Sequence, residues 1–308
     1  MSDVVLLFSG QGAQKVGMGK DFHEASESAR KLFEEANQSL GMNLSGVMFD
    51  GPDEELTRTS RCQPALYLHG LVAMTLLKER VPSLNPVAAA GLSLGEFTAH
   101  ASAGTFSMAD GLRLVAKRGG FMEEACEATT GAMAAMIGGD ESAVVELADE
   151  CGVDVANFNA PGQIVISGSV EGIDAAVEKA KDKGIRRAIK LNVAGAYHSR
   201  LMQSAQDKLA VELGSVEMTA PSIPVVCNYG ATEVSDPAAV RSMLEKQVTG
   251  SVRWTDSIQL LVGKGHTTFI ELGPGKVLAG LVSKIAKDVT VHSVEDLPSL
   301  EACVEALG

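Results

Sequence analysis

Residues 86–97 place a Gly-x-Ser-x-Gly motif directly after a short apolar run and directly before a segment that can form a helix. This is the sequence form of a nucleophile elbow, a sharp strand-to-helix turn that holds a serine exposed at the end of a strand. Gly91 and Gly95 have no Cβ, so the strand and the helix can pack closely around the turn. The start of the helix adds backbone N–H groups that can stabilise an oxyanion. The motif predicts that Ser93 is a catalytic nucleophile.

The composition is that of a globular enzyme with room for more than one domain. The chain has 308 residues, of which 45% are hydrophobic and 21% are charged, and this length allows one large domain plus a smaller one. The formal net charge of −13 argues against a general nucleic-acid-binding protein and gives no attraction to anionic membranes. No apolar run approaches the roughly 18 residues of a membrane-spanning helix, and the N-terminus lacks the basic segment of a signal peptide.

The cysteines are widely spaced, and none forms a Cys-x-x-Cys pair; they are Cys62, Cys126, Cys151, Cys227 and Cys303. An odd number of scattered cysteines is typical of reduced thiols in the cytosol rather than of a disulfide framework or a zinc site. We therefore expect a cytoplasmic protein with no metal site.

Hydrophobic periodicity divides the chain into an α/β frame with an insertion. The first part predicts strands at residues 4–8 and 87–90 and helices at residues 22–40, 64–80 and 109–128. A different pattern follows, with strands at 133–137, 154–159, 163–167 and 187–193 and helices at 141–150 and 170–183. The frame then resumes with helices at 197–213 and 238–247 and strands at 225–227 and 268–271.

The middle pattern, βαββαβ, is the ferredoxin-like order. We therefore expect a ferredoxin-like small domain over residues 129–195. It would be inserted between the two halves, 1–128 and 196–308, of a large α/β-hydrolase-like domain with a parallel sheet.

A serine hydroxyl becomes a good nucleophile when a base within hydrogen-bond reach takes its proton, and histidine suits that role near neutral pH. His198 follows a strand and a small-residue link at the return from the small domain, and domain junctions are where clefts form. It is the favoured base, with a helix-capping role as the alternative. His100 would lie about 10 Å beyond Ser93 on the same helix, so we expect it to be structural. His23 and His69 fall within helical patterns and are read as surface or packing residues.

The remaining polar candidates cannot be ranked from spacing alone. Gln11 lies in a glycine-rich loop after the first strand, where a backbone N–H could complete an oxyanion hole. Arg118 lies on a predicted helix, where a solvated cation is the simpler interpretation. The residues alone thus indicate a serine-dependent acyl-transfer or hydrolytic enzyme and leave its substrate open.

Seven motifs occur in one order along nearly the whole chain. They are residues 8–14 (FSGQGAQ), 91–96 (GLSLGE), 113–119 (RLVAKRG), 157–163 (NFNAPGQ), 197–199 (YHS), Gln247 with 252–254 (VRW), and 271–275 (ELGPG). In these motifs the chain resembles the malonyl-CoA:acyl carrier protein transacylase family, which supplies malonyl units for fatty acid synthesis. That family also carries an inserted ferredoxin-like subdomain.

The resemblance implies a ping-pong acyltransferase that uses malonyl-CoA and the phosphopantetheine thiol of an acyl carrier protein, with no cofactor besides these substrates. It also implies a role for each site residue: Ser93 is acylated, His198 is the base, the backbone N–H groups of Gln11 and Leu94 form the oxyanion hole, Arg118 pairs with the malonyl carboxylate, and the backbone carbonyl of Gln247 orients the histidine. A guanidinium suits the carboxylate because it pairs in a bidentate way. We expect the protein to be a monomer.

Two positions next to the catalytic residues can be compared with the family pattern, and they bear on the site entrance and on substrate choice, respectively. Leu92 stands where the family usually has His before the nucleophile, which removes any hydrogen bond that this histidine would make at the site entrance. Tyr197 is bulky, as in family members that take malonyl, whereas relatives that accept methylmalonyl tend to be smaller there.

The docking surface for the acidic carrier protein needs a local basic patch on this acidic chain. Five basic residues of the small domain are candidates, with a solvated helix end as the alternative: Lys181, Lys183, Arg186, Arg187 and Lys190. Two rival functions remain open. One is a serine esterase or thioesterase of the α/β-hydrolase kind, which would need a triad acid, and the other is a catalytically silent docking subunit.

Overall fold

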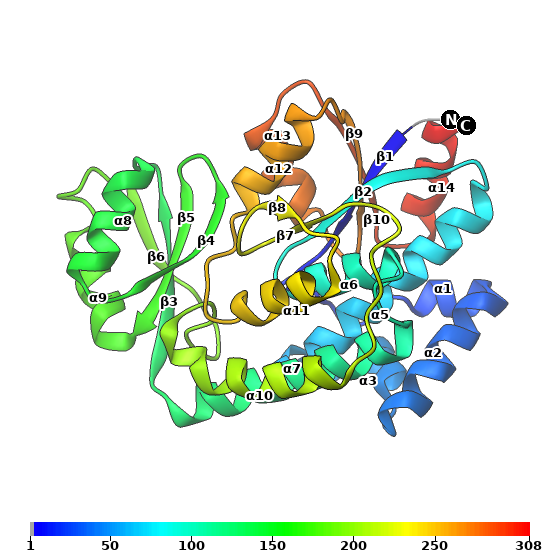
Figure 1. Ribbon diagram of the computed structural model, residues 1–308, viewed down its shortest axis with the longest axis horizontal. Helices are drawn as coiled ribbons and strands as arrows, with labels where there is room; N and C mark the ends of the chain where they lie inside the picture. The colour runs from blue at the N-terminus through cyan, green and yellow to red at the C-terminus, as the bar shows by residue number, and fades with distance from the viewer. Residues whose placement is uncertain (1–2) are drawn as a thin grey trace.

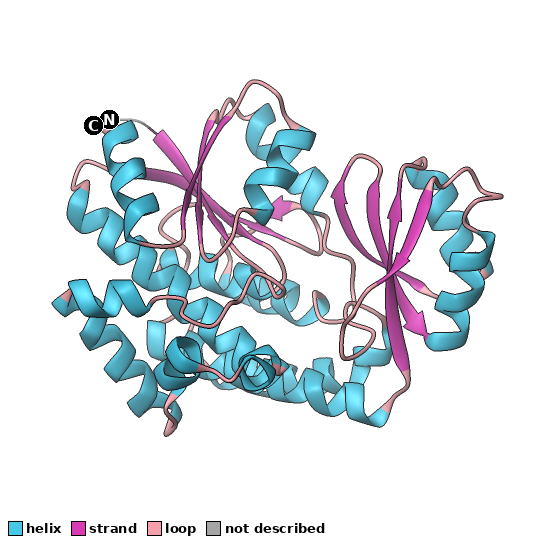
Figure 2. Cartoon of the chain, turned by 180° about the vertical axis from the view of Figure 1, so that it is seen from behind, coloured by secondary structure: helices cyan, strands magenta, loops and turns pink. Residues whose placement is uncertain are grey.

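The computed structural model describes residues 3–308, which form two separate β-sheets with helices around them (Figures 1 and 2). The larger sheet has the order β10-β9-β1-β2-β7-β8 and is parallel except for the terminal β7–β8 pair. Its strands are β1 (Asp3–Phe8), β2 (Asn85–Gly91), β7 (Val225–Cys227), β8 (Thr232–Glu233), β9 (Thr268–Leu272) and β10 (Thr290–Val294). The fold is thus a mixed α/β fold built on a parallel sheet.

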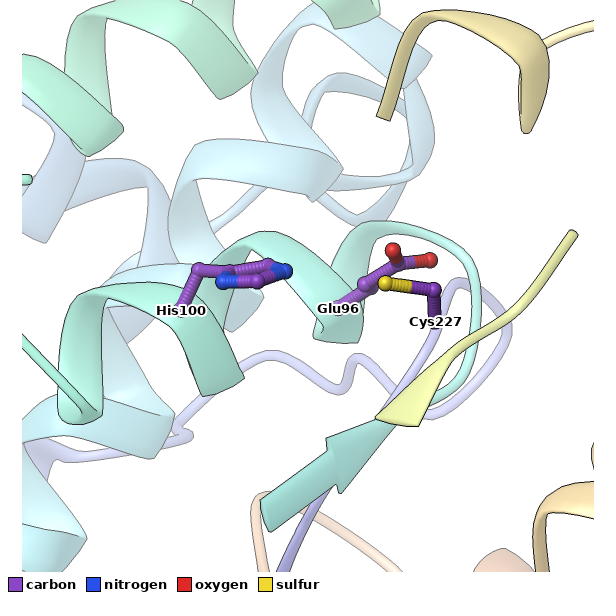
Figure 3. Close-up of side chains that lie close together, drawn as sticks. All are labelled: Glu96, His100 and Cys227. Atoms are coloured by element: carbon purple, nitrogen blue, oxygen red, sulfur yellow. The ribbon is translucent and has the colours of Figure 1, made fainter. Parts of the chain in front are cut away.

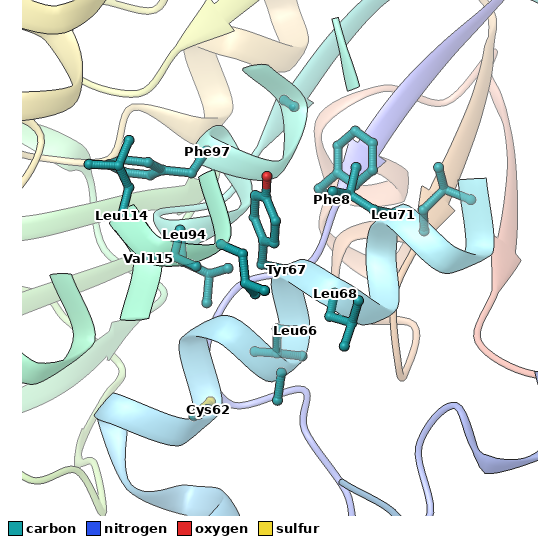
Figure 4. Packing of buried hydrophobic residues seen from close by; sticks show 14 of the residues in the cluster. Phe8, Cys62, Leu66, Tyr67, Leu68, Leu71, Leu94, Phe97, Leu114 and Val115 are labelled. Atoms are coloured by element: carbon teal, nitrogen blue, oxygen red, sulfur yellow. The ribbon is translucent and has the colours of Figure 1, made fainter. Parts of the chain in front are cut away.

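Strand β1 lies in the middle of the larger sheet and is buried on both faces. Its side chains alternate between two apolar clusters, with Leu6 and Phe8 in one and Val5 and Leu7 in the other. A continuous apolar run is what a parallel strand covered on both faces requires. Figure 4 shows Phe8 packed beside the buried helix α5 (Thr59–Arg80) in the first of these clusters.

The remaining helices outside the smaller sheet pack either against the larger sheet or against the helices that cover it. They are α1 (Lys20–Ala25), α2 (Glu27–Leu40), α3 (Leu44–Asp50), α4 (Asp53–Thr57), α6 (Leu94–Ser102), α7 (Met108–Ala128), the 3₁₀ turn η1 (Arg200–Met202), α10 (Gln203–Ser215), α11 (Pro237–Lys246), α12 (Trp254–Gly263), α13 (Val277–Ile285) and α14 (Leu297–Leu307). Within residues 3–308, none of the helices combines the length and the apolar character needed to cross a bilayer.

The smaller sheet has the order β4-β5-β3-β6, and each neighbouring pair is antiparallel. Its elements are β3 (Gly131–Ile137), α8 (Glu141–Glu150), β4 (Asp154–Ala160), β5 (Gln163–Ser169), α9 (Val170–Lys179) and β6 (Arg187–Lys190). The edge strand β4 is joined to the segment before α12, because Phe158 N donates to Val252 O (2.9 Å) and Val252 N donates to Ala156 O (2.8 Å). The two sheets are therefore joined by backbone hydrogen bonds as well as by the chain.

Some predicted boundaries were wrong, and the structure gives the reason. The helix predicted over 22–40 is two helices, because Ser26 is extended and its side chain accepts a hydrogen bond from Ala29 N to begin α2. The strand predicted to reach residue 193 ends at Lys190, and helix α9 ends at Lys179 rather than 183. The helix predicted from residue 197 begins only at Arg200.

Candidate active site

Ser93 lies in the turn between β2 and α6 with φ 56° and ψ −109°, a backbone conformation that non-glycine residues rarely adopt. The turn is tight because a Cβ on Gly91 would lie 2.0 Å from the backbone of Gly95, and one on Gly95 would lie 2.2 Å from Phe8 O. The strand-turn-helix geometry expected of a nucleophile elbow is therefore present at this serine.

Asn228, which the sequence analysis did not single out, fixes this turn from the neighbouring strand. It directly follows β7 and is wholly buried. Its Oδ1 accepts from Ser93 N (2.7 Å), and its Nδ2 donates to Gly91 O (2.7 Å). A strained backbone persists only when its surroundings hold it in place, and Asn228 supplies two of those contacts.

His198 lies within hydrogen-bond distance of the serine, with Nε2 2.8 Å from Ser93 Oγ. Its Nδ1 lies 2.8 Å from the backbone oxygen of Gln247. Because a carbonyl oxygen can only accept, Nδ1 carries the proton and Nε2 presents a lone pair to the serine. Burial, with a smaller effect of the Arg118 charge, lowers the pKa of His198 to about 4. The imidazole is thus neutral at pH 7, as a general base must be.

The helix predicted over residues 197–213 would include His198, and this was wrong, because His198 lies in a turn before η1 with φ 56°. That conformation cannot continue a helix. The turn directs the imidazole at Ser93 rather than along a helix face.

Arg118 is a buried cation rather than a solvated one, with 1% of its surface exposed. Its Nη1 donates to Gln63 Oε1 (2.7 Å), and its Nη2 donates to Gln247 Oε1 (2.8 Å) and to Ser93 Oγ (3.1 Å). Its Nε has no hydrogen-bond partner among residues 3–308. Burial lowers the pKa of Arg118 to about 10, so the group stays charged at pH 7. A buried cation in contact with Ser93 suits an anionic acyl group.

Gln63 was missed at the sequence level, because a polar residue inside a long apolar helix carries no local signal of its partner. It lies in α5 beside Pro64 and is 1% exposed. Its contact with Arg118 becomes visible only when α5 packs against α7.

Ser93 opens onto a cavity of about 690 Å³ that is lined by residues from around both sheets. Asn157 and Val165 line it from strands β4 and β5 of the smaller sheet, and Gln11, Leu92 and Tyr197 line it from outside that sheet. The Tyr197 hydroxyl is paired with Thr59 Oγ1 at 2.7 Å. A cleft between two domains is where substrates usually bind.

Of the two residues expected to form an oxyanion hole, one lines the same cavity as Ser93 and the other follows Ser93 directly in the chain. Gln11 is in the loop after β1 and lines the cavity. Leu94 is the first residue of α6, where backbone N–H groups have no intrahelical acceptor.

The other histidines lie apart from this site. His100 is wholly buried, and its Nδ1 lies 3.0 Å from Thr105 Oγ1. His69 is also buried, with Nε2 3.1 Å from Glu295 O. His23 is half-buried and packs against the rings of Phe33 and Phe49.

The family of acyl transferase domains matches residues 5–302 of this sequence. The chain belongs to that family. Along its full length, this acyl transferase is similar to the malonyl CoA-acyl carrier protein transacylase of Bacillus subtilis (strain 168). The two are 41% identical over 312 residues, which cover 100% of this chain and 98% of the relative. The transacylase of the same name from Escherichia coli (strain K12) is 38% identical over 309 residues, covering 99% of this chain and 100% of the relative.

Solved structures give the same answer for this acyl transferase. The acyl-carrier-protein-S-malonyltransferase from Bartonella henselae superposes with a TM-score of 0.94 at 39% identity, and each chain is covered completely. A malonyl-transacylase solved in complex with its type II PKS acyl-carrier protein superposes with a TM-score of 0.95 at 36% identity, covering 99% of this chain and 100% of that one.

Proposed function

We propose that this acyltransferase moves a malonyl group from malonyl-CoA to the phosphopantetheine thiol of an acyl carrier protein for fatty acid synthesis. The observation that carries the proposal is the position of Ser93 Oγ, which lies 2.8 Å from His198 Nε2 and 3.1 Å from Arg118 Nη2. A base and a buried cation thus converge on one hydroxyl. The homologues that share this fold are named for the same transfer.

The first half-reaction makes an ester on Ser93. His198 Nε2 takes the hydroxyl proton as Ser93 Oγ bonds to the thioester carbonyl carbon. The carbon–sulfur bond then breaks, and CoA leaves with the proton that His198 held. In the second half-reaction the phosphopantetheine thiol gives its proton to His198, and its sulfur bonds to the same carbon. Ser93 leaves and regains a proton from His198.

The negative charge on the carbonyl oxygen develops next to the start of α6. We assign its stabilisation to the backbone N–H groups of Gln11 and Leu94, which would act as an oxyanion hole. The role of Gln247 is supported by its backbone contact with His198. In a triad hydrolase a carboxylate would hold that nitrogen, whereas a backbone carbonyl holds it here.

Arg118 supplies the selectivity in this proposal. Its guanidinium would pair with the distal carboxylate of the malonyl group, which an acetyl group lacks. An acetyl group would leave a buried cation without that partner, and buried unpaired polar groups discriminate strongly. The held carboxylate would also keep the acyl ester in place until the thiol arrives.

The finer assignments on fold and assembly belong to the same proposal. We divide the chain into a large domain, residues 1–128 and 196–308, and a small domain, residues 129–195, because each range has its own sheet. The strand order and the antiparallel pairs of the small sheet support the ferredoxin-like assignment, and the elbow supports the α/β-hydrolase-like one. Every proposed site residue comes from one chain, which favours a monomer as the catalytic unit. The chemistry uses no cofactor besides the two substrates, and the cytoplasmic location stays a prediction.

The carrier protein would dock on the basic residues of the small domain. Lys183 pairs with Glu150 (2.8 Å) and Lys190 pairs with Asp174. Lys181, Arg186 and Arg187 are exposed and form no ion pair within the described part of the chain. These three cations are the part of the patch that remains open to an acidic partner.

The test is the intact-protein mass after mixing with malonyl-CoA, run beside acetyl-CoA and repeated with Ser93→Ala. We expect a malonyl adduct that requires Ser93 and that the carrier protein discharges. An adduct that is discharged by water at the same rate with and without carrier protein would instead indicate a hydrolase. If no activated acyl group forms an adduct, the result would instead support the hypothesis of a catalytically silent docking subunit.

A further inference from the structure

A carboxylate with no part in the proposed chemistry lies wholly buried behind the elbow. Glu96 is on α6, three residues after Ser93, and has no exposed surface. Its Oε2 accepts from Gln247 Nε2 (2.7 Å) and from Asn228 N (2.9 Å). Burying a carboxylate is costly, so these contacts need an explanation.

The contact with Gln247 fixes which way that side-chain amide points. Its Nε2 donates to Glu96 Oε2 and to Ser93 O (3.0 Å). Both oxygens can only accept, so the amide nitrogen must face them and the amide oxygen must face away. That oxygen accepts from Arg118 Nη2 at 2.8 Å. The opposite orientation would turn an NH₂ group toward a guanidinium, and two donors would then face each other.

Gln247 joins the separate parts of the site. Its side chain contacts Arg118 and Ser93, and its backbone oxygen holds His198. Glu96 also acts on Arg118 by charge: burial lowers the pKa of Arg118, and the Glu96 carboxylate partly offsets that shift. The same burial raises the pKa of Glu96, and its hydrogen bonds to Asn228 and Gln247 oppose the rise.

We propose that Glu96 is a positioning residue for malonyl transfer, which holds the Gln247 amide in the orientation that aims Arg118 at the acyl group. The inference rests on the proposed function, and it adds a residue that contacts none of the reacting atoms. It predicts that loss of Glu96 lowers the preference for malonyl over acetyl.

The far side of Glu96 supplies a matched control. Figure 3 shows Glu96 between His100 and Cys227. A carboxylate oxygen of Glu96, a ring nitrogen of His100 and the Sγ of Cys227 lie within 4.8 Å of one another, and all three residues are buried. Neither Glu96 Oε1 nor His100 Nε2 has a hydrogen-bond partner in the 3–308 range. Cys227→Ala therefore alters the surroundings of the same carboxylate while leaving its contacts with Gln247 and Asn228 intact.

The experiment compares the rates of Ser93 acylation by malonyl-CoA and acetyl-CoA in Glu96→Ala, Glu96→Gln and Cys227→Ala, with the melting temperature of each. We expect Glu96→Ala to reduce the malonyl-to-acetyl preference about 10- to 100-fold, as for lost hydrogen bonds to a charged group. Glu96→Gln keeps an oxygen that can accept from both donors, so it should restore most of that preference. Cys227→Ala should keep all of it.

An equal loss of both acyl transfers in Glu96→Ala, or an unchanged preference, would overturn the proposal. If Glu96→Ala does not fold, Gln247→Met removes the same contact from the other side and keeps the backbone oxygen that holds His198. An unchanged malonyl-to-acetyl preference in Gln247→Met would also overturn the proposal. Failure of the wild-type protein to form a malonyl adduct would instead reject the proposed function itself, so the two failures are distinct.

Discussion

Arg118 Nη2 donates a hydrogen bond to Ser93 Oγ across 3.1 Å, so the buried cation and the proposed nucleophile are already in contact. The malonyl carboxylate is separated from the reacting carbonyl by a single CH₂ group. A carboxylate bound at Arg118 therefore brings that carbonyl to Ser93, and binding and orientation become the same event. The guanidinium is itself fixed by Gln63 and Gln247.

Replacing Arg118 should change substrate choice more than it changes acyl transfer itself. We expect Arg118→Ala to lower kcat/KM for malonyl-CoA by about 100-fold or more, the cost of losing a buried charged hydrogen-bond partner. The loss for acetyl-CoA should be smaller. Arg118→Lys keeps the charge but not the planar fork, so it should recover only part of the preference. Equal losses for both substrates, measured by acylation kinetics, would contradict this role.

The acylation rate should respond to pH with a midpoint well below that of an ordinary histidine. Burial lowers the pKa of His198 to about 4, and only the neutral imidazole can take the serine proton. The rate of malonylation should therefore be flat from about pH 6 upward and fall as pH drops toward 4. Rapid-mixing experiments with a short acid pulse, checked by circular dichroism for folding, would measure it. A midpoint near 6.5 would indicate a solvated histidine.

The free energy of unfolding should also fall in acid, because two buried histidines outside the site cannot take up protons in the folded protein. Burial lowers the pKa of His69 to about 4 and that of His100 to about 3. Below pH 6.5 the unfolded chain binds protons at these histidines while the folded chain does not, so the free energy of unfolding decreases as pH falls from 6.5 toward 4. Each such residue contributes about 3 kcal/mol to the loss.

His100→Asn tests this directly, because His100 contacts Thr105 and not the reacting atoms. The variant should show a shallower loss of unfolding free energy between pH 6.5 and 4 in denaturant titrations. Its malonylation rate at pH 7 should match that of the wild-type protein. An unchanged slope would mean that other groups cause the acid response.

If the basic residues of the small domain bind the carrier protein, changing them should affect the KM for the carrier protein alone. Reversing the charge at Arg186 and Arg187 should raise KM for the carrier protein and leave KM for malonyl-CoA unchanged, because steering acts on the acidic partner. Lys78→Glu is a suitable control, since Lys78 lies on α5 and, like Arg186 and Arg187, is exposed and forms no ion pair among residues 3–308. An unchanged carrier KM, measured at low salt, would remove the patch from the docking surface.

Local sequence signals predicted the elements that surround Ser93 well. The strand at 225–227 matches β7, and the helix at 109–128 differs from α7 by one residue. Both carry strong patterns, a β-branched apolar run and a regular apolar face. The division of the helix at Ser26 and the turn at His198 were missed because each depends on the φ of one residue, which periodicity does not report.

The site residues were predicted only in part, because most of their partners are distant in sequence. The Gly-x-Ser-x-Gly motif in its strand-turn-helix setting led to Ser93, and the position of His198 at the return from the small domain favoured it as the base. The burial of Arg118 was not predictable from its helix, since Gln63 reaches it across 55 positions of sequence. Asn228 contacts Ser93 across 135 positions, and nothing in its local pattern distinguishes it from a surface turn residue.

Gly91 should be among the least replaceable residues of the elbow. A Cβ there would lie 2.0 Å from both the carbonyl carbon and the oxygen of Gly95, and neither backbone can withdraw without moving Ser93. Gly91→Ala should therefore lower the free energy of unfolding by about 3 kcal/mol or more and abolish Ser93 acylation in the protein that remains folded.

Gly120→Ala is the matched control: Gly120 lies inside α7 with open space around its Cβ position. It should stabilise the protein by about 0.5–1 kcal/mol. Chemical denaturation would measure the free energy of unfolding of both variants, and intact-mass measurements would follow their Ser93 acylation. Normal acylation of Gly91→Ala would contradict the prediction, because it would show that the turn can accommodate a Cβ at this position.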